Sequence, residues 1–246
     1  MNQSPRPFLR LTPFRALWMG MALGGLLIGL LFLILLRTSH PRPHRIGSRM
    51  AEPGFRLENQ LGQPVSSGSF SGRIEIVSFI SPYCRKACPL IAHHYVAYAR
   101  AIREAGWARK IVLLSFNLDP KRATPKTLQR FQRAFGWAPR NLEWEFLTGS
   151  PRAIDRVVKG GFKVWFGFRP LGTSALTPGG PPPLTWQNPL NPTGAIPEPA
   201  HEDPLEIYGP NHHLRKLYSE GSLVSTGRLL HELFLLLNRG TPPEHA

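Results

Sequence analysis

The stretch "SFISPYCRKACPLIAHHY", residues 78–95, contains both cysteines of this 246-residue chain, Cys84 and Cys88. The apolar, β-branched run "RIEIVSFI" at 73–80 leads into it and predicts a strand buried in the middle of a sheet. A helical pattern follows over 88–105 and stops at a glycine. The two thiols are therefore predicted to lie where a strand ends and a helix begins.

The same order recurs along the chain. A second buried strand is predicted at 110–119, and the two helical stretches after it each begin with a Ser or Thr cap followed by proline, "TPKTLQRFQRAFG" and "SPRAIDRVVKGG". Two short strands around a turn at 205–219 and a leucine-rich helix at 226–238, capped by Ser225 or Thr226, close the pattern. This order predicts an α/β, thioredoxin-like fold, with a central mixed sheet flanked by helices.

The segment 169–200 interrupts this order. It is too rich in proline and glycine for regular structure, so we expect an inserted surface loop there.

The N-terminal part predicts a membrane anchor. Residues 16–36 carry no charge, and at about 1.5 Å per residue a helix of that length crosses a hydrocarbon core of ~30 Å. A cleaved signal peptide fits less well, because its apolar region is shorter and ends at a small-residue cleavage site. We expect a short tail at 1–15, the transmembrane helix, a linker at 37–53, and the folded domain at 54–246.

The formal charge of +15 raises the question of a nucleic-acid partner. Seven arginines and no acidic residue lie within the first fifty residues, and the chain shows no ribonucleoprotein, paired-cysteine zinc or basic-zipper pattern. We therefore expect no nucleic-acid partner.

The predicted position of the thiols favours their charged form. A helix N-terminus stabilises anions, and the neighbouring cations Arg85 and Lys86 lower a thiol pKa. Three interpretations remain open at this point: a structural disulfide, a redox-active pair, or a soft-metal site in which two thiolates and an imidazole hold Cu(I). A structural zinc site fits poorly, because it takes four ligands and the chain has two cysteines.

Four segments carry a resemblance to a known family. "SFISPYCRKACP" matches a C-x-x-x-C-P signature at Cys84, Cys88 and Pro89, and "FNLDPKRATPKTLQRF" matches a D-P-x-R-x-T-P pattern that starts at Asp119. "FRLENQLGQPVSSGSFSGR" and "WEFLTGS" fit that family's opening hairpin and its W-x-x-L-T-G motif. From about residue 55 to its end, the chain resembles the Sco/SenC copper chaperones of the thioredoxin superfamily.

The resemblance implies a copper ion, Cu(I) with Cu(II) as the alternative state, held by Cys84, Cys88 and a histidine ahead of the last hairpin. His201 stands eight residues before the Gly209-Pro210 turn, in a register similar to that of the family, and we predict it to be the third ligand. The other candidates near the site or the hairpin tip are His93, His94, His212 and His213. The family often has Asp directly before its histidine, where this chain has Ala200.

The resemblance also implies a function. The expected role is to deliver copper to the copper-A site of cytochrome c oxidase subunit II, or to reduce the cysteines of that site, with subunit II or another copper chaperone as partner. The alternative is a copper-independent thiol-disulfide oxidoreductase that uses Cys84 and Cys88, and a third possibility is a docking protein with an idle dithiol. We expect a monomer or weak dimer in the bacterial inner membrane, with the domain facing the periplasm; the mitochondrial inner membrane is the alternative.

Overall fold

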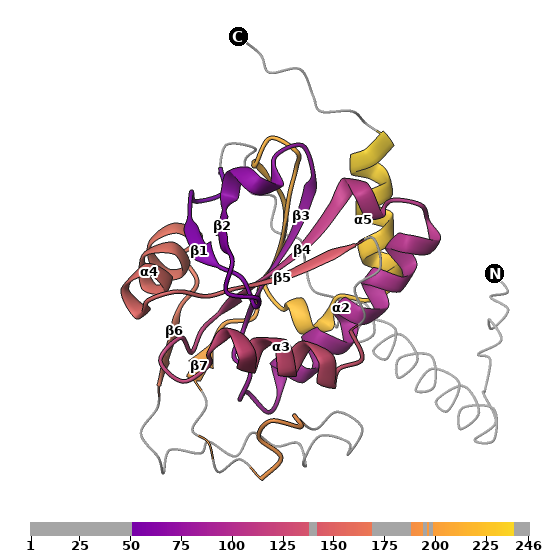
Figure 1. The fold of residues 1–246 in the computed structure, drawn as a ribbon. Coiled ribbons are helices and arrows are strands. Elements are labelled where there is room, and N and C mark those ends of the chain that lie inside the picture. Colours follow the sequence, from indigo (N-terminus) through magenta and orange to yellow (C-terminus); the bar gives the residue numbers. More distant parts are fainter. Residues whose placement is uncertain (1–50, 138–141, 169–187, 194–195, 197–198, 239–246) are drawn as a thin grey trace, which may run out of the picture. The chain divides into compact units, whose positions relative to one another are not determined.

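The computed structural model describes residues 51–137, 142–168, 188–193, 196 and 199–238 (Figure 1). The predicted tail, the predicted transmembrane helix at 16–36 and most of the predicted linker lie outside these residues. Within the described part of the chain, no helix has the length and apolar character needed to cross a membrane. The last residues of the predicted linker pack on the domain, since Ala51 forms a β-bridge with His213.

A five-stranded mixed sheet forms the centre of the domain (Figure 1). Its order is β5-β4-β3-β8-β9, with β3, β4 and β5 parallel, β8 antiparallel to β3, and β9 antiparallel to β8. The strands are β3 (Ile74–Ile80), β4 (Ile111–Asn117), β5 (Glu143–Leu147), β8 (Leu205–Tyr208) and β9 (Leu214–Tyr218). The predicted α/β class and mixed sheet are confirmed.

Both faces of the sheet are covered, which explains why β3 and β4 are buried along their whole length. Ile74, Ile76 and Ile80 point to one face, and Val77 and Phe79 point to the other. The first face packs against α2 (Ala87–Glu104), α3 (Pro125–Ala134) and α5 (Thr226–Asn238). The second packs against α4 (Pro151–Asp155), the π-helical turn Arg156–Phe162 and a small hairpin of β1 (Arg56–Glu58) and β2 (Pro64–Ser66).

The helices begin where the sequence predicts. The side chains of Thr124 and Ser150 each accept a hydrogen bond from a backbone N–H of the first turn, and a proline follows each cap. Ser225 caps α5, since its side chain accepts a hydrogen bond from the N–H of Arg228. Gly106, directly after α2, has a φ of 74°, a conformation that glycine adopts without strain.

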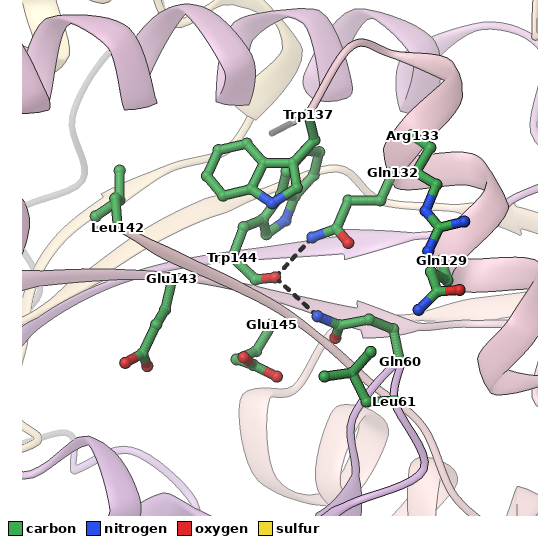
Figure 2. A pocket seen from close by; sticks show the side chains of 10 residues that line it. All are labelled: Gln60, Leu61, Gln129, Gln132, Arg133, Trp137, Leu142, Glu143, Trp144 and Glu145. Carbon is green, nitrogen blue, oxygen red and sulfur yellow. Dashed lines mark hydrogen bonds between the residues drawn. The ribbon is translucent and has the colours of Figure 1, made fainter. Parts of the chain in front are cut away.

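The open edge of β5 is closed by a glutamine side chain (Figure 2). Gln60 donates to the carbonyl oxygen of Trp144 at 3.3 Å and accepts from the N–H of Phe146 at 2.9 Å, as a neighbouring strand would. Gln132 donates to the same carbonyl at 2.7 Å. The hollow that these residues line therefore borders a sheet edge at which the carbonyl of Trp144 and the N–H of Phe146 are already hydrogen-bonded.

A second hairpin forms the base of the insert. β6 (Phe166–Phe168) pairs antiparallel with β7 (Pro199–His201), so that Phe166 lies opposite His201. The predicted loop at 169–200 therefore ends inside a strand, and most of its other residues lie outside the described part of the chain. This short ladder fixes the position of His201.

Candidate metal centre

Three predicted site residues converge at the carboxyl end of β3. Cys84 lies in the loop after this strand, Cys88 in the first turn of α2, and His201 at the end of β7. The Nε2 atom of His201 is 3.3 Å from the Sγ atom of Cys88, and the two sulfurs and one ring nitrogen lie within 4.8 Å of one another. Both cysteines are buried free thiols. One ion could therefore contact all three side chains.

Backbone N–H groups donate hydrogen bonds to both sulfurs and stabilise negative charge on them. The N–H of Ser81 donates to Cys88 Sγ at 3.3 Å, and the N–H of Cys88 donates to Cys84 Sγ at 3.5 Å. These donors are available because β3 has ended and the first N–H groups of α2 have no partner within the helix. They stabilise thiolates, the form in which cysteine binds metals and attacks disulfides.

The electrostatics of the site couple a thiolate to the imidazole. The hydrogen bond from Cys88 lowers the pKa of Cys84 well below its usual value; burial opposes this, and the hydrogen bond and charge of His201 add to it. Burial acts to lower the pKa of His201, but the hydrogen bond and charge of Cys84 outweigh it and raise that pKa. Without metal, the arrangement therefore favours a thiolate at Cys84 beside a protonated imidazole.

The ring of His201 is fixed in orientation. Its Nδ1 atom lies 2.7 Å from the carbonyl oxygen of Glu202, so Nδ1 carries a proton and donates it to that oxygen, which leaves Nε2 to face the sulfurs. The N–H of Glu202 donates to the carbonyl of Trp165 at 3.2 Å, and Glu202 Oε2 accepts from the N–H of Trp165 at 3.1 Å. Such support of the second ring nitrogen is typical of histidines that bind metals.

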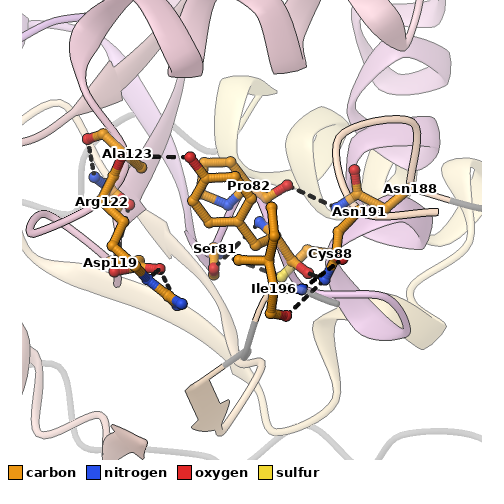
Figure 3. Close-up of polar contacts among 11 residues, drawn as sticks. Ser81, Pro82, Cys88, Asp119, Arg122, Ala123, Asn188, Asn191 and Ile196 are labelled. Carbon is orange, nitrogen blue, oxygen red and sulfur yellow. Dashed lines mark hydrogen bonds and ion pairs between the residues drawn. The ribbon is translucent and has the colours of Figure 1, made fainter. Parts of the chain in front are cut away.

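Two asparagines near the end of the insert hold the cysteine loop from outside (Figure 3). Buried Asn188 donates to the carbonyl oxygens of Pro82 and Cys84, both at 2.7 Å. Asn191 donates to the carbonyl of Tyr83 at 2.8 Å. The sequence prediction missed these residues, although the repeated Asn-Pro pairs at 188–189 and 191–192 are a recognisable turn signal.

The loop after β4 supports the cysteine loop from the other side (Figure 3). The buried carboxylate of Asp119 accepts from Arg122 Nε at 2.8 Å. The Arg122 guanidinium lies 5.5 Å from the ring centroid of Tyr83, whose hydroxyl donates to the Arg122 carbonyl at 3.3 Å. Two of the sequence motifs that carried the resemblance, around Cys84 and around Asp119, therefore meet in space.

The other candidate histidines occupy different environments. His93 packs edge-on against Phe135, and His94 stacks on Tyr98. His213 bonds to the carbonyl of Asn211 through Nδ1. Among the described residues, His201 is the histidine grouped with both sulfurs, as the sequence register predicts.

Comparisons with known proteins agree with this geometry. A family model described as SCO1/SenC matches residues 44–175. The SCO1 protein homolog of Bacillus subtilis (strain 168) is 30% identical over 140 residues, which cover 56% of this chain and 70% of that protein.

Solved structures show the same fold. The copper-bound ScoI of Arabidopsis thaliana superimposes with a TM-score of 0.59 at 18% identity, covering 78% of this chain and 98% of its own. Copper-bound Sco1 of yeast gives a TM-score of 0.59 at 14% identity, covering 78% of this chain and 91% of its own. The family model spans more than half of the sequence, and the chain belongs to the SCO1/SenC family.

Proposed function

We propose that this chain is a membrane-anchored copper chaperone that delivers copper to the copper-A site of cytochrome c oxidase subunit II, or reduces the cysteines of that site. The observation that carries the proposal is the convergence of Cys84, Cys88 and His201. Two thiolates and one imidazole form a soft donor set that suits Cu(I). The proposed anchor is the uncharged segment 16–36, which would hold the domain at the periplasmic face of a bacterial inner membrane.

The relatives support this assignment. The Arabidopsis and yeast proteins hold copper in their crystal structures. Another protein of known structure, BsSco, is described as a member of the Sco family of cytochrome c oxidase assembly proteins and as having a disulfide switch. Copper is here the cargo, and the domain provides a site that can take it up and release it.

Copper uptake is linked to proton release. The lowered pKa of Cys84 and the raised pKa of His201 favour a thiolate beside an imidazolium in the metal-free site, and the Cys88 sulfur lies 3.3 Å from the imidazole Nε2. A copper ion would displace any proton held by a ligand sulfur or by His201 Nε2. Since His201 is the partly exposed member of the set, we propose that an acceptor approaches from its side.

A thiol-disulfide reductase is the second candidate. Cys84 and Cys88 are four residues apart with their sulfurs close together, and the lowered pKa of the Cys84 thiol suits nucleophilic attack on a partner disulfide. In that reaction the two thiols form one disulfide, and two electrons and two protons pass to the partner. His201 would then tune reactivity without being a ligand.

The direct test is copper stoichiometry and X-ray absorption on the purified protein. We expect one copper per chain with sulfur and nitrogen neighbours. His201→Ala should lose the nitrogen neighbour and weaken copper retention at least about tenfold, since even residues that only orient a ligand contribute that much. His213→Ala is the matched control and should bind like the parent; an equal loss in this variant would mean that His201 is the wrong histidine.

A further inference from the structure

A second cluster of ligand-type side chains lies at the opposite end of β3 from the cysteines. It brings together Glu52, which precedes β1, Glu75 near the start of β3, and His212 in the turn between β8 and β9. The Nδ1 atom of His212 is 2.7 Å from Glu75 Oε1 and 3.1 Å from Glu52 Oε2. One ligand atom from each residue lies within 4.8 Å of the other two.

The two carboxylates are buried, and some of their oxygens lack hydrogen-bond donors within the described part of the chain. Their side chains have no solvent exposure, whereas that of His212 is 24% exposed. Among the described residues, Glu52 Oε1 and Glu75 Oε2 accept no hydrogen bond. Burial raises the pKa of Glu52 to about 9 and the pKa of Glu75 to about 7, because two adjacent carboxylates are costly to ionise in a buried site. A divalent cation between them would compensate their charge and favour the ionised forms.

The histidine is oriented in the manner of a metal ligand. Its Nε2 atom lies 2.8 Å from Ser71 Oγ, so that Nδ1 faces the two carboxylates. Its backbone has a φ of 58°, in the left-handed region. The N–H of Glu52 donates to the His212 carbonyl at 2.6 Å, which fixes these two ligands relative to each other.

We propose that Glu52, Glu75 and His212 form a second metal site that binds a borderline divalent cation of the Zn²⁺ type. Two carboxylates and a neutral imidazole with one divalent cation have no net charge. Oxygen and nitrogen donors at about 2.0 to 2.2 Å suit Zn²⁺, and three protein ligands leave a fourth position for water. The donor set differs from the thiolate site, which prefers soft Cu(I).

The proposed ion joins three distant parts of the chain. Glu52 lies near the end of the predicted linker, Glu75 belongs to the central strand, and His212 lies in the last hairpin. Bound zinc would therefore fasten the start of the domain to its sheet and stabilise the folded state. The role proposed for this site is structural and is independent of the copper function.

The test uses the full-length chain with Cys84→Ser and Cys88→Ser, which removes the thiolate site with little change in shape. Zn²⁺ is added, excess metal is removed by desalting, and retained zinc and the unfolding temperature are measured. We expect one equivalent of zinc and a higher unfolding temperature with zinc than with a chelator. Adding Glu75→Gln or Glu52→Gln should weaken zinc binding at least about tenfold, whereas adding His213→Ala should leave it unchanged.

Two results would overturn the proposal. If the folded thiol-free protein retains no zinc and its unfolding temperature does not respond to it, a shared proton balances the carboxylates. If the Glu75→Gln and Glu52→Gln variants retain zinc like the thiol-free parent, the ion binds elsewhere. Because the first result needs no change in the cluster, the test does not depend on whether the glutamine variants fold.

Discussion

The side-chain amide of Asn188 lies between two carbonyl oxygens of the cysteine loop, 2.7 Å from that of Pro82 and 2.7 Å from that of Cys84. The far end of the proline-rich insert is thereby fastened to the loop that carries the first thiol. β7, which carries His201, follows the same segment. The insert therefore links the loop that carries Cys84 to the strand that carries His201.

Replacing Asn188 should loosen this loop. Asn188→Ala removes two hydrogen bonds to carbonyl groups, and we expect a loss of about 2 kcal/mol in the free energy of unfolding. Asn188→Asp should be worse, because a carboxylate cannot donate to the two oxygens. Denaturant unfolding measures the stability, and competition with a copper chelator should show roughly tenfold weaker retention.

Asn211→Ala is the matched control for this experiment. Its side chain accepts a hydrogen bond from Arg215 on an exposed turn, so its loss should change stability by less than about 0.5 kcal/mol. An Asn188→Ala protein that unfolds and holds copper like the parent would contradict the role assigned to the amide.

The sequence predicts the parts of this fold whose pattern is long enough to be distinctive. β3 and β4 are continuous apolar runs because both faces of the sheet are covered, and α3 shows its cap and its proline. β6 and β7 have three residues each, too few for a period, and their pairing depends on contacts across the insert. His201 could be predicted because it stands at a fixed spacing before the Gly209 turn, and that turn is present in the fold.

Buried polar groups were the hardest to predict. Glu75 stands inside the apolar run of β3 and Glu206 inside β8, and neither position differs in sequence from a solvent-facing one. Their burial follows from which strands become neighbours, since β8 pairs directly with β3 and brings Glu206 opposite Val77. Sequence periodicity carries no information about that pairing.

The burial of Glu206 predicts a pH-dependent stability. Burial raises its pKa from 4.5 to about 7, although its hydrogen bond from Tyr208 acts in the opposite direction. Because the folded-state pKa is raised, the stabilisation is fully present below about pH 4.5 and is lost as the pH rises through about 7. The loss attributable to this group is at most about 3 kcal/mol.

Thermal unfolding of the parent and of Glu206→Gln between pH 5 and pH 8 measures this effect. The glutamine stays neutral, so the variant should lose less stability than the parent over this range. Glu104→Gln, at an exposed position at the end of α2, should follow the parent curve. Parallel curves for the parent and Glu206→Gln would show that Glu206 does not titrate in this range.

The proposed anchor predicts the side of the membrane on which the thiols lie. With the N-terminus in the cytoplasm, alkaline phosphatase fused after Ala246 should be active, and a fluorescent protein that folds only in the cytoplasm should be dark. Deleting residues 16–36 should abolish the phosphatase signal. The reverse pattern would place Cys84 and Cys88 in a reducing compartment and contradict the oxidase-assembly role.

The last prediction separates copper delivery from thiol reduction. Copper binding needs both thiolates and, in our assignment, the imidazole that lies 3.3 Å from Cys88 Sγ. Disulfide exchange begins with one attacking thiolate and uses the second thiol to resolve the mixed disulfide, so it has no strict need for the imidazole.

We therefore expect His201→Ala to impair copper-A assembly in cells nearly as much as Cys84→Ser, measured by oxidase activity and the copper-A spectrum at limiting copper. His213→Ala should assemble normally. Cys88→Ser should lose stable copper binding, and as a reductase it would trap its partner in a covalent complex through Cys84. If His201→Ala assembles oxidase like the parent while Cys84→Ser does not, the sulfurs act by electron transfer alone and the reductase mechanism replaces the copper-carrier mechanism.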